Sequence, residues 1–298
     1  MVSVASKYGE GARANERSRA GTVAESGTAI ELGERLTRDL RRAAATLSSQ
    51  EARFLVDYYY QAQENRKRAY SQLRALTEAA EPHEVIGWLA QNHKVVLEAG
   101  LRTVLGAYAD SKREGAWAQS IVGIGPVLSA GLLAHIDIAQ APTAGHIWRF
   151  AGLDPSVVWG KGEKRPWNAA LKVLCWKISE SFVKTKTRDG AYYGPLYDER
   201  KAYELAKNER GEYADQAAAK LVKFKIGKDT EAFTWYSIGK LPPGHIHARA
   251  ERWTVKLFLS HYQAVAWEVR FGEKPPAPFA PAILGHAHTI VPPNWPME

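Results

Sequence analysis

Two glycines and a proline lie close together in the segment SIVGIGPVLSAGLL, residues 120–133. Gly123 and Gly125 are separated only by Ile124, and Pro126 follows directly. Glycine has no Cβ, so backbone N–H groups in such a turn can approach an anion closely. Pro126 suits the first position of a helix, and a helix N-terminus attracts negative charge. These residue types in this order indicate a phosphate-binding turn between two helices.

The order hydrophobic-Gly-hydrophobic-Gly, with the small residue Ser129 four positions after the second glycine, is typical of a helix-hairpin-helix. Such an element contacts the nucleic-acid backbone and carries no sequence information. We therefore predict that Gly123, Ile124, Gly125 and Ser129 bind nucleic acid. The alternative is an ordinary tight turn in which Ile124 fills the core between packed helices. The turn lacks the Lys and Ser/Thr of a P-loop, which argues against a nucleotide cofactor.

A basic stretch follows the turn, between residues 161 and 188, and contains only two acidic residues, Glu163 and Glu180. Its basic residues are Lys161, Lys164, Arg165, Lys172, Lys177, Lys184, Lys186 and Arg188. Such an excess can neutralise several phosphates and makes affinity depend strongly on salt. Trp159 and Trp167 flank the loop and could stack on bases, the alternative being that they pack the loop onto the core. We predict nucleic-acid contacts at Lys161, Lys164, Arg165, Lys172 and Trp159.

Histidines are concentrated near the C-terminal end, where five of the nine occur: His245, His247, His261, His286 and His288. The two His-x-His pairs, together with His261, could supply three or four ligands to Zn²⁺ or another transition metal. The spacing matches no metal motif. The alternatives are histidines that hydrogen-bond the Pro-rich tail to the preceding helix, or phosphate contacts beside Arg249, Arg252 and Lys256.

Composition limits the class of protein that must position these residues. The chain has 298 residues, of which 45% are hydrophobic, so it can bury a sizeable core. Its 40 Lys and Arg exceed 32 Asp and Glu, a balance that suits a polyanionic partner. A single cysteine, Cys175, excludes an internal disulfide and a Cys-rich zinc cage. No apolar stretch is long enough to span a membrane and the N-terminus lacks the apolar segment of a signal peptide, so we expect a cytoplasmic location and no membrane partner.

The hydrophobic pattern predicts an all-α protein, a helical bundle with a helix-hairpin-helix element. We expect a disordered, mildly basic tail over residues 1–28, long amphipathic helices over 29–117, a helix-hairpin-helix domain over 118–210, and a His-rich helical, Pro-rich extension over 211–298. Ser48 and Glu51 form a capping-box pattern at the start of a long helix. An apolar stripe then runs from Leu55 to Leu76, interrupted by Arg66. It predicts either a homodimer through a short coiled coil or packing inside a bundle.

A longer window brings a resemblance to a known family. The segments IVGIGPVLSAGLLAHI, IWRFAGLDPSVVWGKGEKRP, WNAALKVLCWKISESF and YYGPLYDERKA follow one another between residues 121 and 202. In this order they resemble the C-terminal domain of the DEDD-type insertion-sequence transposases, enzymes that recombine DNA under the guidance of a bridge RNA. The resemblance covers about residues 118–210, and it implies a role in DNA transposition or recombination for a mobile genetic element.

The resemblance also implies two catalytic parts, and we expect neither to be complete in this chain. In the family a RuvC-like domain supplies four metal-binding acids, whereas residues 1–117 show no strand that carries an early Asp. The family's nucleophilic serine aligns with Gly160, which has no nucleophile. Ser156 is the remaining candidate nucleophile, and it requires a shifted loop register.

We therefore expect a transposase-like protein that binds DNA, or an RNA and DNA junction, and is not catalytic alone. The partners expected are DNA, structured RNA, a second copy of the chain and a separate nuclease protein. One alternative is a recombinase or nuclease subunit that completes an active site in trans or uses a His-bound metal. Another is a non-catalytic helical assembly protein whose basic loop is a solvated face.

Overall fold

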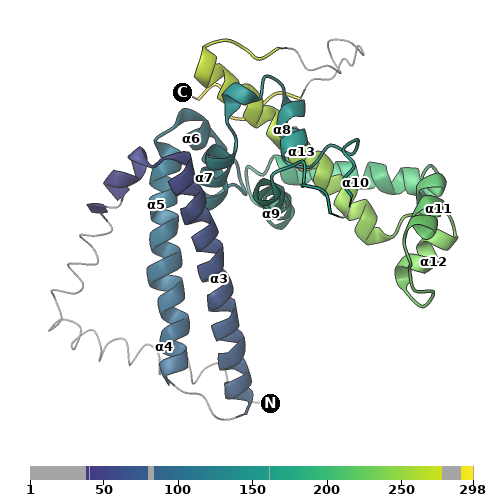
Figure 1. Cartoon of the computed structure of the whole chain (residues 1–298), viewed down its shortest axis with the longest axis horizontal. Coiled ribbons are helices and arrows are strands. Elements are labelled where there is room, and N and C mark those ends of the chain that lie inside the picture. The colour runs from purple at the N-terminus through teal and green to yellow at the C-terminus, as the bar shows by residue number, and fades with distance from the viewer. Residues whose placement is uncertain (1–37, 40, 80–83, 161, 277–289, 298) are drawn as a thin grey trace.

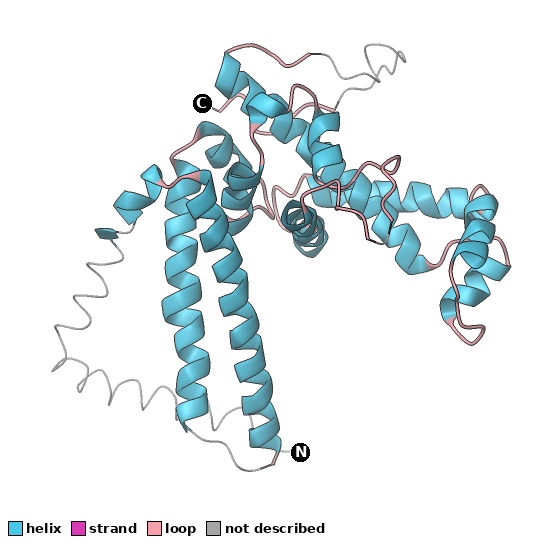
Figure 2. Cartoon of the chain, viewed as in Figure 1, coloured by secondary structure: helices cyan, strands magenta, loops and turns pink. Residues whose placement is uncertain are grey.

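The computed structural model of the chain describes residues 38–39, 41–79, 84–160, 162–276 and 290–297. Throughout these residues the secondary structure is helical and contains no strand, which confirms the predicted all-α class (Figure 2). The predicted tail at 1–28, most of the Pro-rich extension, Lys161, His286 and His288 lie outside the described residues. None of the helices in the described part of the chain is long and apolar enough to cross a membrane.

Two long antiparallel rods form an arm that projects from the rest of the protein (Figure 1). One rod is α3 (Ser49–Glu78), and the other consists of α4 (Glu84–Asn92), the π-type turn η3 (His93–Glu98) and α5 (Ala99–Asp110). The short helix η2 (Ala44–Thr46) precedes α3.

The capping box predicted at the start of α3 is present. Ser48 N donates to Glu51 Oε2 at 2.8 Å, and Glu51 N donates to Ser48 Oγ at 3.2 Å. These bonds satisfy the backbone N–H groups of Ser48 and Glu51 at the helix end, and they lower the pKa of the Glu51 carboxyl group. The long helix therefore begins at the residue that the sequence indicates.

The apolar stripe of α3 is covered by the protein's own second rod. Val56, Tyr59, Ala62 and Ala69 are buried where α3 faces η3, α4, α5 and α7. Arg66, which interrupts the stripe, donates from Nε to Glu98 Oε1 at 2.5 Å, and Glu98 is itself buried. The apolar face of α3 is therefore covered by helices of the same chain. The apolar stripe gives no reason to expect a dimer.

The main core lies between helices that are distant in sequence. They are α6 (Arg113–Ser120), α7 (Pro126–His135), α8 (Ala144–Phe150), α9 (Ala169–Thr185) and α13 (Pro243–Phe271). Trp117 is fully buried and stacks on Phe258 with ring centres 5.9 Å apart. One side of α9 is buried from Leu171 to Phe182, and burial raises the pKa of Cys175 to about 12. Because α13 supplies Phe258 to this core, the last long helix packs together with the helices of 118–210.

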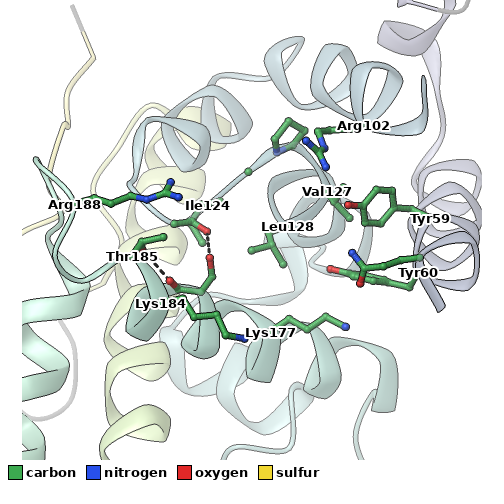
Figure 3. A pocket seen from close by; sticks show the side chains of 15 residues that line it. Tyr59, Tyr60, Arg102, Ile124, Val127, Leu128, Lys177, Lys184, Thr185 and Arg188 are labelled. Atoms are coloured by element: carbon green, nitrogen blue, oxygen red, sulfur yellow. Dashed lines mark hydrogen bonds between the residues drawn. The ribbon is translucent and has the colours of Figure 1, made fainter. Parts of the chain in front are cut away.

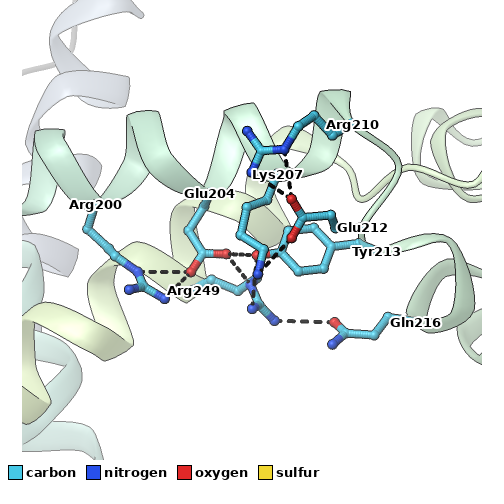
Figure 4. Close-up of polar contacts among 8 residues, drawn as sticks. All are labelled: Arg200, Glu204, Lys207, Arg210, Glu212, Tyr213, Gln216 and Arg249. Carbon is cyan, nitrogen blue, oxygen red and sulfur yellow. Dashed lines mark hydrogen bonds and ion pairs between the residues drawn. The ribbon is translucent and has the colours of Figure 1, made fainter. Parts of the chain in front are cut away.

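A smaller group of helices packs beside α13 at the far end from the arm (Figure 1). It comprises α10 (Tyr193–Glu209), α11 (Ala214–Lys223) and α12 (Glu231–Ser237). Glu204 lies at its centre, with a side chain only 1% exposed, and accepts hydrogen bonds from Arg200, Tyr213 and Arg249 (Figure 4). Burial alone would raise the pKa of Glu204, but these three donors outweigh burial and hold the pKa below its ordinary value.

Candidate nucleic-acid interface

The glycine turn joins α6 to α7 and is fixed against α9. Gly123 has φ 101°, a left-handed conformation that side chains rarely adopt. A Cβ there would lie 2.9 Å from Thr185 Oγ1 and 3.1 Å from Phe182 Cδ1. The carbonyl of Gly123 accepts a hydrogen bond from Ser181 Oγ at 2.6 Å. Only glycine therefore allows the turn to lie this close to α9.

The second glycine leaves the start of α7 open. Gly125 is the N-cap residue and supplies no side chain to accept hydrogen bonds from the first N–H groups of the helix. Pro126 occupies the first helical position, and a Cβ on Gly125 would meet nothing within 4 Å. The backbone N–H groups of Val127 and Leu128, in the first turn, are therefore free of a side-chain cap. They form the positive end of the helix, which can bind an anion.

A pocket of about 560 Å³ lies directly against this turn (Figure 3). Its walls come from α3, α5, α7, α9 and the residues after α9. Four of the lining side chains are basic, none is acidic, and the rest are polar, apolar or glycine: Tyr59, Tyr60, Gln63, Arg102, Gly123, Ile124, Gly125, Pro126, Val127, Leu128, Lys177, Ser181, Lys184, Thr185 and Arg188. We call this set the turn pocket. An open helix N-terminus and four cations in one hollow attract a phosphate.

The cations of the turn pocket are incompletely neutralised. Lys177 Nζ lies 4.0 Å from the centre of the Tyr60 ring, and its pKa is lowered first by burial and then by the nearby charge of Lys67. Lys184 Nζ pairs with Glu180 Oε2 at 2.7 Å. Arg188 is exposed, as is Arg102 across the pocket. A bound anion would relieve the repulsion among these groups.

Two predicted contact residues belong to the packing of the turn. Ile124 is only 4% exposed and lies in the core, as the alternative of a tight turn with an apolar plug required. Ser129 is fully buried, and its Oγ donates to the carbonyl of Gly115 at 2.8 Å, which joins α7 to α6. A small residue at this position lets the two helices approach, so the sequence signal at Ser129 reflects helix packing.

A second group of basic residues lies outside the turn pocket: Lys164 and Arg165 in the loop before α9, and Lys172 in α9. Arg165 lies 5.1 Å from the Trp159 ring, and Lys172 lies 4.4 Å from the Trp167 ring. Burial, followed by the charges of Arg252 and Arg165, lowers the pKa of Lys172. None of these residues lines the turn pocket. The basic stretch that the sequence presents as one surface is therefore divided between two places, and the second contains Lys164, Arg165, Lys172 and Trp159.

The two loop tryptophans differ in their surroundings. Trp167 packs over Gly152, where a Cβ would lie 2.6 Å from the indole, so it holds the loop against the core. Trp159 is 41% exposed, and its Nε1 donates to the carbonyl of Glu163 at 2.8 Å. Of these two tryptophans, Trp159 is the more exposed and the one that a partner can contact.

The loop positions considered for catalysis are held by local hydrogen bonds. The Ser156 hydroxyl donates to Asp154 Oδ1 at 2.7 Å, and the same oxygen accepts from the Ser156 N–H at 2.9 Å. Hydrogen bonds from Ser156 lower the pKa of Asp154, which makes this carboxylate a weaker base. The Gly160 N–H donates to Glu163 Oε2 at 2.8 Å. Ser156 thus occupies a turn and has no strong base beside it among these contacts.

The three C-terminal histidines that the structure describes lie apart from one another. His245, His247 and His261 all lie on α13, where residues two apart point to nearly opposite faces and 14 residues span about 21 Å. His245 Nδ1 lies 3.4 Å from the Tyr236 hydroxyl. His261 is buried, with Nδ1 2.7 Å from the Tyr193 hydroxyl and Nε2 2.8 Å from the carbonyl of Ile290. These three histidines therefore do not meet at one metal ion, and His261 ties the chain around Ile290 to the helix, as the hydrogen-bonding alternative required.

The arginine candidate on α13 is also engaged elsewhere. Arg249 Nε donates to Glu204 Oε2 at 2.7 Å, and its Nη1 donates to Gln216 at 3.2 Å. Arg249 therefore stabilises the contact of α13 with α10 and α11.

His247 is the histidine that meets other metal-ligand types. Its Nε2 lies 3.5 Å from Glu251 Oε2 and 4.0 Å from Glu180 Oε1. Burial, then the charge of Glu180, raises the pKa of Glu251 to about 7. No local sequence pattern indicates this cluster, because Glu180 lies on a different helix, 67 residues before His247.

The burial of His261 predicts a pH-dependent stability. Burial lowers the pKa of this imidazole from 6.5 to about 4, so the unfolded chain binds the proton more readily. Stability should be complete above pH 6.5 and fall by roughly 3 kcal/mol as the pH is lowered to 4. Urea unfolding between pH 7 and pH 4 measures this loss, with His261→Gln as the comparison. An identical pH dependence in both proteins would contradict the assignment.

Several residues of the turn pocket carry no local sequence signal. Tyr59, Tyr60 and Gln63 come from α3, and Arg102 comes from α5. They reach the glycine turn only because the arm packs on α7. Sequence distance hides such a neighbourhood, whereas the glycines and Lys177, Lys184 and Arg188 were visible in the pattern.

Part of this region is similar to a known family. Residues 116–166 match the sequence profile of the Transposase IS116/IS110/IS902 family. The matched segment runs from α6 through the glycine turn, α7 and α8 to the loop before α9. It supports a transposase-type domain at these residues and a transposase-related role. A search of curated proteins and a search of solved structures each found no match.

Proposed function

We propose that the chain binds the phosphate backbone of DNA at the turn pocket, as part of transposition or recombination. The observation that carries this proposal is the meeting of an uncapped helix N-terminus with four basic side chains in a hollow lined by no acidic residue. The family match over residues 116–166 includes this turn and supports a transposase-related role. The turn pocket lies where a helix-hairpin-helix binds DNA, at the turn between its two helices, where backbone amides contact one DNA strand.

The contacts offered by the turn pocket would contribute to the affinity for DNA and to the position of the strand on the protein. They would not distinguish one base sequence from another. Backbone N–H groups at Val127 and Leu128 and the charges of Lys177 and Arg188 are suited to phosphate oxygens. Contacts of this kind release counterions, so binding weakens steeply as salt increases. The turn pocket would fix the position of a strand on the protein.

The loop group extends the proposed interface to unpaired or distorted nucleic acid. Trp159 is exposed beside Arg165, and Lys164 and Lys172 lie in the same loop and the start of α9. An exposed indole with neighbouring cations suits base stacking. On this basis an RNA and DNA junction, or a branched DNA, would bind more tightly than plain duplex.

Strand cleavage, in this proposal, comes from a separate protein. Gly160 offers no nucleophile, and the Ser156 hydroxyl is held by Asp154 in a turn. The chain would position the strand while a nuclease partner acts on it.

Direct binding measurements test the proposal. Fluorescence anisotropy of the full chain with duplex, single-stranded and branched DNA and with a structured RNA, at two salt concentrations, gives both affinity and salt dependence. We expect binding to all four and the tightest binding to the branched form. No binding to any of them at about 50 mM salt would overturn the proposal.

Removal of single pocket cations should change the salt dependence by a defined amount. Lys177→Ala or Arg188→Ala should each weaken DNA binding and lower the slope of log affinity against log salt by about 0.9, because each loses one phosphate contact. Lys228→Ala is the matched control, since Lys228 is an exposed cation between α11 and α12. Equal slopes for the pocket variants and the control would argue against the turn pocket as the binding site.

A further inference from the structure

A cluster of three metal-ligand side chains lies between α9 and α13, and it adjoins the turn pocket, because Glu180 pairs through Oε2 with Lys184. Glu180 comes from α9, and His247 and Glu251 come from one face of α13 at a spacing of four residues. One ligand atom from each lies within 4.8 Å of the other two. Three side chains from two helices are therefore already gathered around one point.

The separations between the ligand atoms are close to those of a metal site. His247 Nε2 lies 3.5 Å from Glu251 Oε2 and 4.0 Å from Glu180 Oε1. Nitrogen and oxygen ligands at about 2.1 Å from a tetrahedral Zn²⁺ are about 3.4 Å apart. Small side-chain movements would be sufficient to close the site around such an ion.

The ring of His247 is oriented by a residue outside the cluster. The Tyr197 hydroxyl, on α10, lies 2.7 Å from Nδ1, so Nε2 is the nitrogen that faces the two carboxylates. Metal-bound histidines commonly donate their second ring N–H to such a partner, which fixes both tautomer and direction. Tyr197 is itself buried, which holds this arrangement in place.

The carboxyl group of Glu251 is buried against that of Glu180, and the cation nearest to it among its described contacts is the imidazole of His247. The residue is only 7% exposed. Its Oε1 accepts one long hydrogen bond, from Ser179 Oγ at 3.5 Å, and its Oε2 faces His247. A buried carboxylate is costly unless a cation or several donors satisfy it. His247 and Glu180 are 34% and 24% exposed, so an ion can reach the cluster from solvent.

We propose that Glu180, His247 and Glu251 bind a first-row divalent metal ion, with Zn²⁺ as the reference ion and Tyr197 as the positioning residue. One imidazole with two carboxylates suits such an ion better than Mg²⁺, which prefers oxygen ligands and retains water. Three protein ligands leave a position for water. The ion would join α9 to α13, and the proposal does not depend on nucleic-acid binding.

Titration of the full chain with Co²⁺, followed by visible absorption, and with Zn²⁺, followed by calorimetry, tests this proposal. We expect one ion per chain, with affinity reduced at least tenfold by His247→Ala and by Glu251→Gln. His245→Ala, on the same helix but outside the cluster, should bind as the unaltered chain does. So should the double variant His286→Ala/His288→Ala.

Two further variants keep the test decisive if His247→Ala does not fold. Glu180→Gln changes a partly exposed side chain on the other helix and should also reduce affinity at least tenfold. Tyr197→Phe keeps all three ligands and should weaken binding by about tenfold while altering the Co²⁺ spectrum. The proposal is overturned if the full chain takes up no Zn²⁺ or Co²⁺ at about 100 µM. It is also overturned if binding survives Glu180→Gln and Glu251→Gln unchanged.

Discussion

Replacing Gly125 by aspartate is expected to weaken DNA binding by about 300-fold while the protein stays folded. Gly125 is the N-cap of α7 with φ −94° and ψ 178°, a conformation in which aspartate is a favoured cap. Its carboxylate would accept hydrogen bonds from the N–H groups of Val127 or Leu128 and would place a negative charge in the turn pocket. A lost charge-assisted hydrogen bond and a like charge beside phosphate each cost about 1.5–2 kcal/mol, in total about 3.5 kcal/mol.

Two further variants separate the charge from the added side chain. Gly125→Asn caps the helix in the same way without a charge, so anisotropy should show a smaller loss, of about tenfold. Gly125→Ala leaves the N–H groups free, and its Cβ meets no atom within 4 Å, so it should bind nearly as the unaltered chain does. Thermal unfolding should show Gly125→Asp to be at least as stable as the unaltered chain. If the aspartate variant bound DNA as tightly as the unaltered chain, the turn pocket would not be the site that binds a DNA phosphate.

Removal of the Glu204 carboxylate is expected to destabilise the protein by roughly 3.5 kcal/mol. Glu204→Ala would leave Arg200 and Arg249 without their counter-ion and the Tyr213 hydroxyl without its acceptor. Breaking a buried ion pair typically costs about 3–5 kcal/mol, and the two arginine side chains are 28% and 23% exposed, which favours the lower part of that range. Urea unfolding measured through the transition gives the value.

The matched control for this variant is Glu199→Ala, an exposed carboxylate on the same helix. It should change the stability by less than about 0.5 kcal/mol. Glu204→Gln keeps the shape and one acceptor oxygen, so it should lose less than the alanine variant. A loss for Glu204→Ala no larger than for Glu199→Ala would show that the contacts in Figure 4 do not hold α10, α11 and α13 together.

The pattern of the sequence was sufficient for the fold class and for the start of several helices. Ser48 and Glu51 mark the beginning of α3, and Pro126 marks that of α7, because capping chemistry is local. The partner of an apolar stripe is not local information, and the stripe of α3 was satisfied by α4, η3 and α5 within the same chain.

Predicting the sites was harder, since their residues meet through tertiary packing. Gly123 and Gly125 could be identified from spacing, but Tyr60 and Arg102 reach them from the arm. The His-x-His pair at 245 and 247 suggested a shared metal until the start of α13 at Pro243 placed both histidines in one helix. Glu180 joined His247 only through the packing of α9 on α13.

The arm sets a fixed distance between the turn pocket at its base and its tip. Tyr60 lines the turn pocket, and α3 continues for another eighteen residues to Glu78. At 1.5 Å per residue this length is about 27 Å, close to eight base pairs of B-form DNA. A molecule that contacted both the turn pocket and the tip of the arm would have to bridge that distance. Oligonucleotides shorter than this length could contact the turn pocket alone, whereas longer ones could also contact the tip.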